Sequence, residues 1–345
     1  MEYDVAASSK HALVILETGA VPFCYYENPR FHSSAEPQWM PAGLLAGIVR
    51  HARKEQISLT FLLGKARPPA KLERLIDAHA KIVPLSLEKL YPDGVLVLDA
   101  DEASAFPELS RSLDRNVILR VGRHNLKKCG ALFESLAGKF KRLSIHLVGM
   151  EYFTPADFAV YEKELRKMRT ALSQLYRDGQ AIEVNVLTDR IMLTSMRNCD
   201  AGVKHFTVAP NGKCYICPAF YCDDENSFIG AFDGKSGFSV KPVAGVDLPS
   251  GPLCSRCDAY HCKRCVFLNK TTTLELNVPS EQQCTVAHIE REASRQLLID
   301  LGSAEPFHRM PRIAELNYRD PLELIDSPPR DVRAQAADPA ADPML

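Results

Sequence analysis

Cysteines are the residues of this chain whose number and spacing indicate a chemical role. The sequence of 345 residues holds 11 cysteines, and nine of them fall in one stretch of its C-terminal half. Such a density has three physical explanations, which are disulfides, zinc sites and iron-sulfur clusters. The nine candidate metal ligands are Cys199, Cys214, Cys217, Cys222, Cys254, Cys257, Cys262, Cys265 and Cys284.

The cellular compartment separates disulfides from the two metal explanations. The N-terminus carries Glu2 and Asp4 and lacks a basic segment followed by an apolar one, so we do not expect secretion. Disulfides are therefore the weakest explanation, and we expect a cytoplasmic protein. Zinc and iron-sulfur clusters both stay open, because three Cys-x2-Cys pairs have zinc-site spacing and His261 could add an imidazole. The pairs are Cys214/Cys217, Cys254/Cys257 and Cys262/Cys265.

Charge and hydropathy exclude two classes of partner. With 42 basic and 43 acidic residues, the formal net charge is -1, so no strong attraction to nucleic acid or anionic lipid is indicated. No apolar run approaches the roughly 18 residues that would cross a bilayer. The sequence predicts a soluble protein with no nucleic acid and no membrane as partners.

Short apolar stretches alternate with helical segments through the first half of the chain. This rhythm is typical of parallel strands joined by crossover helices, and it predicts a parallel sheet or partial barrel. The seven predicted strands are His11–Glu17, Ile57–Leu63, Lys81–Leu85, Gly94–Asp99, Asn116–Val121, Leu143–Val148 and Ala181–Leu187.

Helical periodicity is clearest after Thr154. Thr154 can cap a helix over Pro155–Tyr176, in which Asp157 opposes the helix dipole and an apolar stripe faces the sheet. We also predict helices over Leu44–Lys54 and Leu126–Phe140.

Polar residues gather where the predicted strands end, which is where parallel α/β proteins place reactive groups. Each could equally be a solvated loop residue or a helix cap. In the last strand, Glu183 and Asn185 alternate with apolar residues and could face a cavity. The strand-end residues are Glu17, Asp99, Asp101, Arg120, Arg123, His124, Glu151, Tyr152, Asn185 and Asp189.

The order of the cysteines resembles the SPASM extension of radical S-adenosylmethionine (SAM) enzymes. Cys199 precedes Gly212 by a 12-residue gap, four residues separate Gly212 from Cys217, and a four-cysteine group and a last cysteine follow. Asn211-Gly212 predicts a tight hairpin whose returning strand delivers Cys217. The four-cysteine group departs from the family, because its gaps are x2, x4, x2 where the family has x2, x5, x3.

The resemblance implies two auxiliary [4Fe–4S] clusters. One would use Cys199, Cys217 and Cys265 with help from Cys222 or Cys214. The other would use Cys254, Cys257, Cys262 and Cys284. Ser280 and Gln283 predict a capping box for a helix whose first turn holds Cys284; amide donors there would favour a thiolate.

The radical centre of such enzymes is missing. They carry Cys-x3-Cys-x2-Cys after the first strand, whereas this chain has the single Cys24 in VPFCYYENP. The second strand ends in Leu63-Gly64-Lys65 rather than in a Gly-Gly-Glu-like segment that holds the cofactor. We therefore do not expect S-adenosylmethionine to bind, nor radical chemistry by this chain alone.

The motifs FCYYENP, PAGLLAGI and ELNVPSEQQC, together with the SPASM-like middle, resemble the CXXX repeat peptide maturase family over roughly residues 10 to 300. The resemblance implies a radical-SAM-like partial (β/α) barrel over 1–190 and a SPASM-like domain with a C-terminal helix over 191–300. An extended, largely disordered tail is expected over 301–345. The implied role is maturation of ribosomally made cysteine-repeat peptides beside a complete radical SAM enzyme.

Two other functions stay open. The cysteines could hold zinc in a structural or peptide-binding scaffold with no redox role. Alternatively, Cys24 could be a reactive thiol, since Glu27 and His32 lie close to it in sequence.

Overall fold

A computed structural model describes residues 11–105, 112–196, 199–302 and 313 of the chain. Its eleven described strands form one sheet in the order β11-β10-β9-β8-β1-β2-β3-β4-β5-β6-β7. The strands are β1 (His11–Ile15), β2 (Ser58–Leu62), β3 (Ala80–Pro84), β4 (Val95–Asp99), β5 (Ser112–Gly122), β6 (Phe140–Val148), β7 (Glu183–Val184), β8 (His205–Val208), β9 (Lys213–Tyr215), β10 (Gly230–Asp233) and β11 (Gly237–Val240).

Strands β1 to β7 run parallel in chain order, and β8 adds to the other side of β1, also in parallel. The seven predicted strands and the partial parallel barrel are therefore confirmed. Strands β9, β10 and β11 continue the sheet as antiparallel neighbours. The hairpin between β8 and β9 is confirmed, and Gly212 takes a φ of 77° that glycine adopts without strain. The returning strand ends at Tyr215, so Cys217 lies just beyond it.

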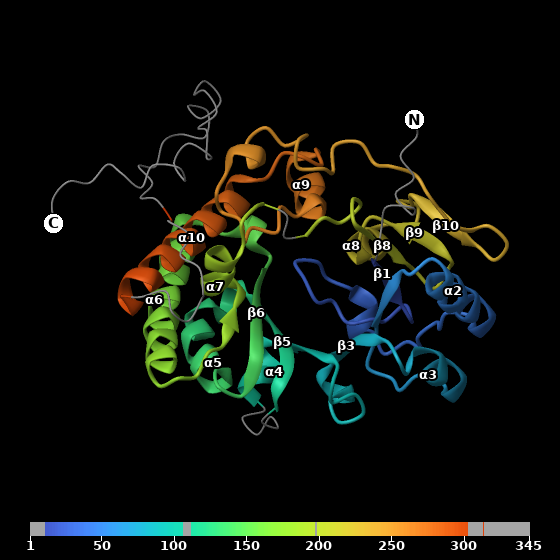
Figure 1. Ribbon diagram of the computed structural model, residues 1–345, viewed down its shortest axis with the longest axis horizontal. Coiled ribbons are helices and arrows are strands. Elements are labelled where there is room, and N and C mark those ends of the chain that lie inside the picture. The colour runs from blue at the N-terminus through green and yellow to red at the C-terminus, as the bar shows by residue number, and fades with distance from the viewer. Residues whose placement is uncertain (1–10, 106–111, 197–198, 303–312, 314–345) are drawn as a thin grey trace.

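Helices cover the outer face of the sheet (Figure 1). Figure 1 shows α2 and α3 on the side of β1 and β3, and α5, α6 and α10 on the side of β5 and β6. The helices are α2 (Ala42–Lys54), α3 (Ala70–Ile76), α4 (Ala100–Ala105), α5 (Cys129–Leu136), α6 (Pro155–Arg177), α7 (Asn185–Met192), α8 (Pro218–Asp223), α9 (Val266–Thr273) and α10 (Glu281–Leu301). Short 3-10 turns are η1 (Pro29–His32), η2 (Leu85–Leu87), η3 (Arg123–Lys128), η4 (Met150–Tyr152) and η5 (Cys254–Arg256).

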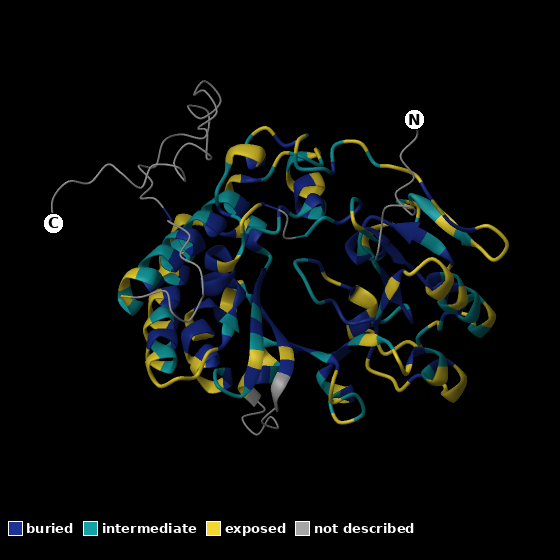
Figure 2. Cartoon of the chain, in the orientation of Figure 1, coloured by how far each residue is buried: buried dark blue, intermediate teal, exposed yellow. Residues whose placement is uncertain are grey.

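The two faces of the sheet carry separate cores, because successive side chains of a strand point to opposite faces. The outer core joins Val14 and Phe61 to α2 and α3, and a second outer core joins β4, β5 and β6 to α5, α6 and α10. The inner core, which we call the concave core, holds Leu13, Ile15 and Tyr215. Figure 2 shows that the strands are mostly buried and that exposed residues concentrate on the helices.

Two predicted elements differ in extent. The last strand stops at Val184, because the Asn185 side chain bonds the backbone of Ile145 and the Thr188 hydroxyl bonds the Val184 amide, which turns the chain into α7. The helix predicted over Leu126–Phe140 begins as a 3-10 turn and ends at Leu136, before Gly138 with a φ of 77°. The helix after Thr154 is confirmed with its capping box.

The expected tail over 301–345 lies outside the described residues, apart from Leu301 and Gly302 at the end of α10 and the buried Ile313. Among the helices of the described ranges, none is both long and apolar enough to cross a membrane.

Candidate metal centre

Strand register places three polar side chains in a row at the carboxyl ends of β4, β5 and β6. Asp99 pairs with Arg120, and Arg120 pairs with His146. Arg120 is 2% exposed, and its guanidinium donates to Asp99 at 3.0 Å and to Glu27 at 2.6 Å. A buried guanidinium needs such partners, because an unpaired charge in an apolar interior is costly.

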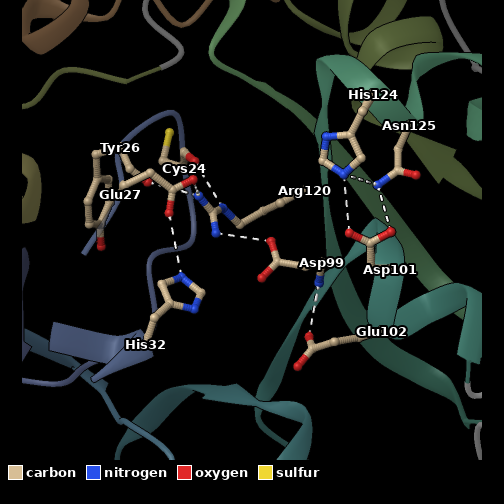
Figure 3. A network of polar contacts seen from close by, with 10 residues as sticks. All are labelled: Cys24, Tyr26, Glu27, His32, Asp99, Asp101, Glu102, Arg120, His124 and Asn125. Atoms are coloured by element: carbon tan, nitrogen blue, oxygen red, sulfur yellow. Dashed lines mark hydrogen bonds and ion pairs between the residues drawn. The ribbon is translucent and has the colours of Figure 1, made fainter. Parts of the chain in front are cut away.

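The same guanidinium fixes the loop that follows β1. Arg120 Nε donates to the carbonyl of Cys24 at 3.4 Å, and Nη2 donates to the carbonyl of Tyr26 at 3.0 Å (Figure 3). The Cys24 sulfur lies 4.0 Å from Nδ1 of His146. Burial, helped by nearby cationic side chains, lowers the pKa of His146 to about 3, so the ring is neutral at physiological pH.

Four thiols form what we call the first thiol group: Cys24, Cys199, Cys217 and Cys265. Burial raises the pKa of Cys24 to about 11, and the charge of Cys199 raises it further. Burial raises the pKa of Cys265 well above its ordinary value, and the charges of Cys24, Cys217 and Cys199 add to that effect. Burial also raises the pKa of Cys217, and the charges of Cys199 and Cys24 add to that effect. Each thiol therefore has the others as electrostatic neighbours.

Two thiols of this group stand at the starts of helices. Cys217 is the N-cap residue of α8 and Cys265 is the N-cap residue of α9, and neither sulfur accepts a hydrogen bond from its helix. The positive end of a helix dipole favours a thiolate, which is the form that binds metal.

Four more thiols form the second thiol group: Cys254, Cys257, Cys262 and Cys284. Burial raises the pKa of Cys284 to about 12, and the charges of Cys254 and Cys257 add to it. The amide of Ala259 donates to Cys257 and that of Arg264 donates to Cys262, each at 3.4 Å. Both loops therefore carry the same two-residue N–H···S turn.

Charged side chains hold the second thiol group in place. Asp258 accepts two hydrogen bonds of 2.6 Å from Arg291 on α10 and one of 3.2 Å from Arg190 on α7. Arg264, at a φ of 45°, donates to the carbonyls of Val246 and Asp247. These bonds tie the cysteine loops to the helices beneath them.

The helix that supplies Cys284 begins as predicted. Ser280 caps α10 and accepts from the amide of Gln283 at 3.3 Å. The Gln283 side chain bonds Asn269 at 2.9 Å instead of returning to the cap, so the capping box has one of its two bonds.

Two histidines lie beside the second thiol group. His261, the possible zinc ligand, is buried, and its Nε2 lies 3.2 Å from a carboxylate oxygen of Glu290. Nε2 of His288 lies 3.9 Å from the Cys257 sulfur. Sequence reasoning missed His288, because it sits in an amphipathic helix four residues after Cys284 and no motif marks it.

Two predicted ligands lie apart from these contacts. Cys214 points into the outer core with Phe206 and Val208, whereas Cys199 and Cys217 pack against the concave core. Cys222 packs against the concave core too, but the charges that act on it come from Arg30 and Asp223.

The donor set of each group is four thiols, which fits a metal-thiolate centre. All 11 cysteines are free, and within the described ranges no three His, Cys, Asp or Glu side chains converge on one point at metal-ligand distance. The thiols are neighbours held by buried loops, and their raised pKa values mean that metal would have to displace the protons.

Most of the remaining strand-end residues form ion pairs or hydrogen bonds with other side chains or with the backbone. Asn185 lines a small cavity with Tyr25 and His261, whereas Glu183 pairs with Arg142 and does not face it. Glu151 lies in η4 with Tyr152, which is 73% exposed. The other contacts join Asp101 to His124 and Asn125, Arg123 to Asp157, and Arg142 to Asp189.

Glu17 fills the mouth of the barrel beside β2. Glu17 is 1% exposed, its Oε1 has no hydrogen-bond partner among the described residues, and burial raises its pKa to about 7. A Cβ at Gly64 would lie 2.0 Å from Glu17 Oε1, so only glycine permits this approach. The segment Leu63-Gly64-Lys65 therefore packs against a carboxyl of the chain itself.

Comparisons with known proteins agree at the level of the fold. No model of a known protein family matches the sequence, and no curated protein matches it. The solved structure of native anSMEcpe with bound AdoMet and Kp18Cys peptide is similar, with a TM-score of 0.56, 12% identity, and coverage of 84% of this chain and 98% of that one. Histidine-tagged anSMEcpe with bound AdoMet gives a TM-score of 0.54 at 12% identity, covering 86% of this chain and 97% of that one. The chain therefore shares with anSMEcpe an α/β fold with a large parallel sheet, and a cysteine-rich region follows in its C-terminal half.

Proposed function

We propose that this chain acts in the maturation of ribosomally made cysteine-repeat peptides as a radical-SAM-like protein without a radical centre of its own. It binds the precursor peptide, relays electrons to a complete radical SAM enzyme, or does both. Each thiol group holds one [4Fe–4S] cluster. Residues 1–190 form the barrel, residues 191–300 form the SPASM-like unit, and the work is done in the cytoplasm without nucleic acid or membrane.

The observation that carries the proposal is the gathering of eight thiols in two groups of four on a radical SAM/SPASM-type fold. Backbone amides donate to two sulfurs of the second group. Hydrogen bonds to sulfur and burial are the features that set the reduction potential of a cluster. Four thiolates per group are also the ligand set that a [4Fe–4S] cluster takes.

Tyr25 is close to both groups. It packs against the same core as Cys265 of the first group and lines a small cavity with Cys262 of the second. Its ring packs edge-on against His146 with 5.2 Å between centroids. A buried aromatic ring between two clusters supports a path for electrons from one to the other.

The barrel mouth supports the loss of the radical centre. One thiol, Cys24, stands in the loop after β1, and its contacts there are Arg120 and His146. The space beside Gly64 is taken by Glu17. The similar anSMEcpe structure has AdoMet and a peptide bound, so the peptide part of that activity is the part we extend to this chain.

Burial argues against Cys24 as an independent nucleophile. A reactive thiol needs a lowered pKa, whereas burial raises the pKa of Cys24 to about 11. Glu27 bonds Arg120 and lies 3.9 Å from His32, so these two side chains form a separate contact (Figure 3).

Elemental analysis and a product assay test the proposal together. Protein purified without oxygen and reconstituted with iron and sulfide should be brown and hold about eight iron atoms per chain. With S-adenosylmethionine and a strong reductant, the chain alone should form no 5'-deoxyadenosine. Colourless protein with stoichiometric zinc after reconstitution would reject the clusters, and catalytic 5'-deoxyadenosine would reject the loss of the radical centre.

A zinc-binding scaffold is the second candidate. The 3.9 Å approach of His288 to Cys257 favours it, because cysteine and histidine together are typical zinc ligands. In that case the metal would fold the cysteine loops and no electrons would move. The same elemental analysis separates the two functions.

A further inference from the structure

A cluster at the first thiol group needs four ligands. The C-terminal segment places only three cysteines there. These are Cys199, Cys217 and Cys265, and a [4Fe–4S] cluster takes four. Cys214 points into the outer core on the other face of the sheet. Cys222 lies on the concave side, near Arg30, Tyr26 and Asp223.

Cys24 reaches the first thiol group from the barrel. Its loop packs on both sides of the site, since Phe23 joins the concave core that Cys199 and Cys217 contact, and Tyr25 joins the core that Cys265 contacts. The two carbonyl bonds from Arg120 fix the backbone on either side of Tyr25. The sulfur is left facing His146 at 4.0 Å, within the protein.

Positive charge accompanies this placement. Arg120 lies against the loop, with Nε 3.4 Å from the carbonyl of Cys24, and Lys263 follows Cys262 in the chain. A cluster with four thiolates carries net negative charge, so cations beside it are stabilising. The buried His146 adds a ring nitrogen 4.0 Å from the Cys24 sulfur.

We propose that Cys24 is the fourth ligand of the iron-sulfur cluster in the first thiol group. The cluster therefore takes one thiolate from the loop after β1 and three from the C-terminal segment. Iron bonds to the Cys24 sulfur and the thiol proton is released to solvent, with no change in the oxidation state of sulfur. This assignment rests on the proposed function, which places one cluster at the first thiol group, and it decides that Cys24 rather than Cys222 or Cys214 completes the ligand set. In radical SAM enzymes the loop after the first strand holds the radical-generating cluster. In this chain the same loop provides a ligand to an auxiliary cluster.

A set of serine variants tests the ligand. In a Cys254→Ala/Cys284→Ala background, which leaves the first thiol group intact, reconstituted protein should hold about four iron atoms per chain. Adding Cys24→Ser should remove the cluster or convert it to a three-iron form with a changed EPR spectrum. Adding Cys222→Ser or Cys214→Ser should leave iron content and spectrum unchanged.

The outcomes separate this inference from the function beneath it. If Cys222→Ser or Cys214→Ser removes the cluster while Cys24→Ser keeps iron and spectrum unchanged, Cys24 is not the ligand and the proposed function stands. If wild-type protein takes up no iron, both fall. Circular dichroism of the metal-free variants shows whether each still folds.

A measurement on the wild-type chain guards against a Cys24→Ser variant that does not fold. In urea sufficient to expose the thiols of metal-free protein, N-ethylmaleimide should modify Cys24 in that form but not in loaded protein. Cys265 should be protected in parallel, and Cys129, buried in the outer core, serves as the thiol that loading does not protect. Equal modification of Cys24 in both forms would overturn the assignment.

Discussion

The two thiol groups are assembled in different ways. The second group draws its four cysteines from residues 254–284, so short loops and the start of α10 build it. The first group joins Cys24, after the first strand, to cysteines that follow 175 to 241 residues later in the chain. The second group therefore depends on local folding of the cysteine loops. The first group depends on packing of the barrel against the C-terminal segment.

This difference shows how long-range packing brings a loop of the first half to the cysteines of the second half. Asp99, Arg120 and His146 form a row at the strand ends. Arg120 binds the loop after β1 through the carbonyls of Cys24 and Tyr26 (Figure 3). The strand ends thus hold in place the loop that carries one member of the first thiol group.

Removal of metal should have the largest effect. Between the end of β11 and α9, η5 is the one regular element in the described structure, so bound metal should supply much of the order there. We expect trypsin to cut at Arg256 or Lys263 at least about tenfold faster in chelator-treated protein, which corresponds to about 1.4 kcal/mol of local stability. Equal cleavage of loaded and metal-free protein, followed by mass spectrometry, would contradict a structural role for metal.

Single variants should separate the groups. Cys284→Ala should halve the iron content to about four per chain, leave the first cluster, and loosen only the local loops. Cys265→Ala should also halve it, and in addition should lower the thermal midpoint of the barrel, because the link between Cys24 and the segment is lost. If both variants shift the barrel unfolding transition equally in calorimetry, the contrast between the groups is wrong.

Arg120→Met should destabilise the loop of Cys24. The variant loses two carboxylate partners and two carbonyl bonds from a guanidinium that is 2% exposed, and we expect a loss of about 2–4 kcal/mol in the free energy of unfolding. Iron of the first group should also be released faster to a chelator. Arg123→Met is the matched control, because its pair with Asp157 is half exposed and should contribute about 0–1 kcal/mol. Urea unfolding of the metal-free variants gives both values, and similar losses would contradict the tethering role of Arg120.

Glu17→Gln should change stability with pH while leaving both thiol groups loaded. The pKa of Glu17 is raised from an ordinary 4.5 to about 7, because burial disfavours its ionised form. Below pH 4.5 the carboxyl is neutral in both the folded and the unfolded chain, so its burial does not lower the free energy of unfolding. Between pH 4.5 and 7 the unfolded chain ionises first, and wild-type stability falls by about 3 kcal/mol.

The glutamine variant should therefore be more stable than wild type at pH 8 by up to that amount and equal to it at pH 4. Urea unfolding at the two pH values checks this. Equal stabilities at pH 8 would show that Glu17 is not held in a desolvated site.

Local patterns in the sequence predict the elements but not their partners. The apolar runs of β1 to β6, the Thr154 cap of α6 and the Asn211-Gly212 hairpin follow from rules that act over a few residues. The row of Asp99, Arg120 and His146 depends on the register between three strands, which no local pattern specifies. Cys24 could not be assigned to the first thiol group for the same reason, since its neighbours are set by long-range packing.

The side chain of Asn185 shows a related limit. Alternation over Ala181–Leu187 predicts a strand, yet the amide bonds the backbone of Ile145 at 2.7 Å and 2.9 Å and the chain turns into α7. Side-chain competition for backbone groups overrides the two-residue period there.

Native mass spectrometry of the chain, purified and reconstituted without oxygen, tests the central claim most directly. The claim predicts one dominant species whose mass exceeds that of the polypeptide by two [4Fe–4S] clusters, falling to one cluster in Cys24→Ser and in Cys284→Ala. A dominant species carrying zinc, or carrying no metal after reconstitution, would contradict it.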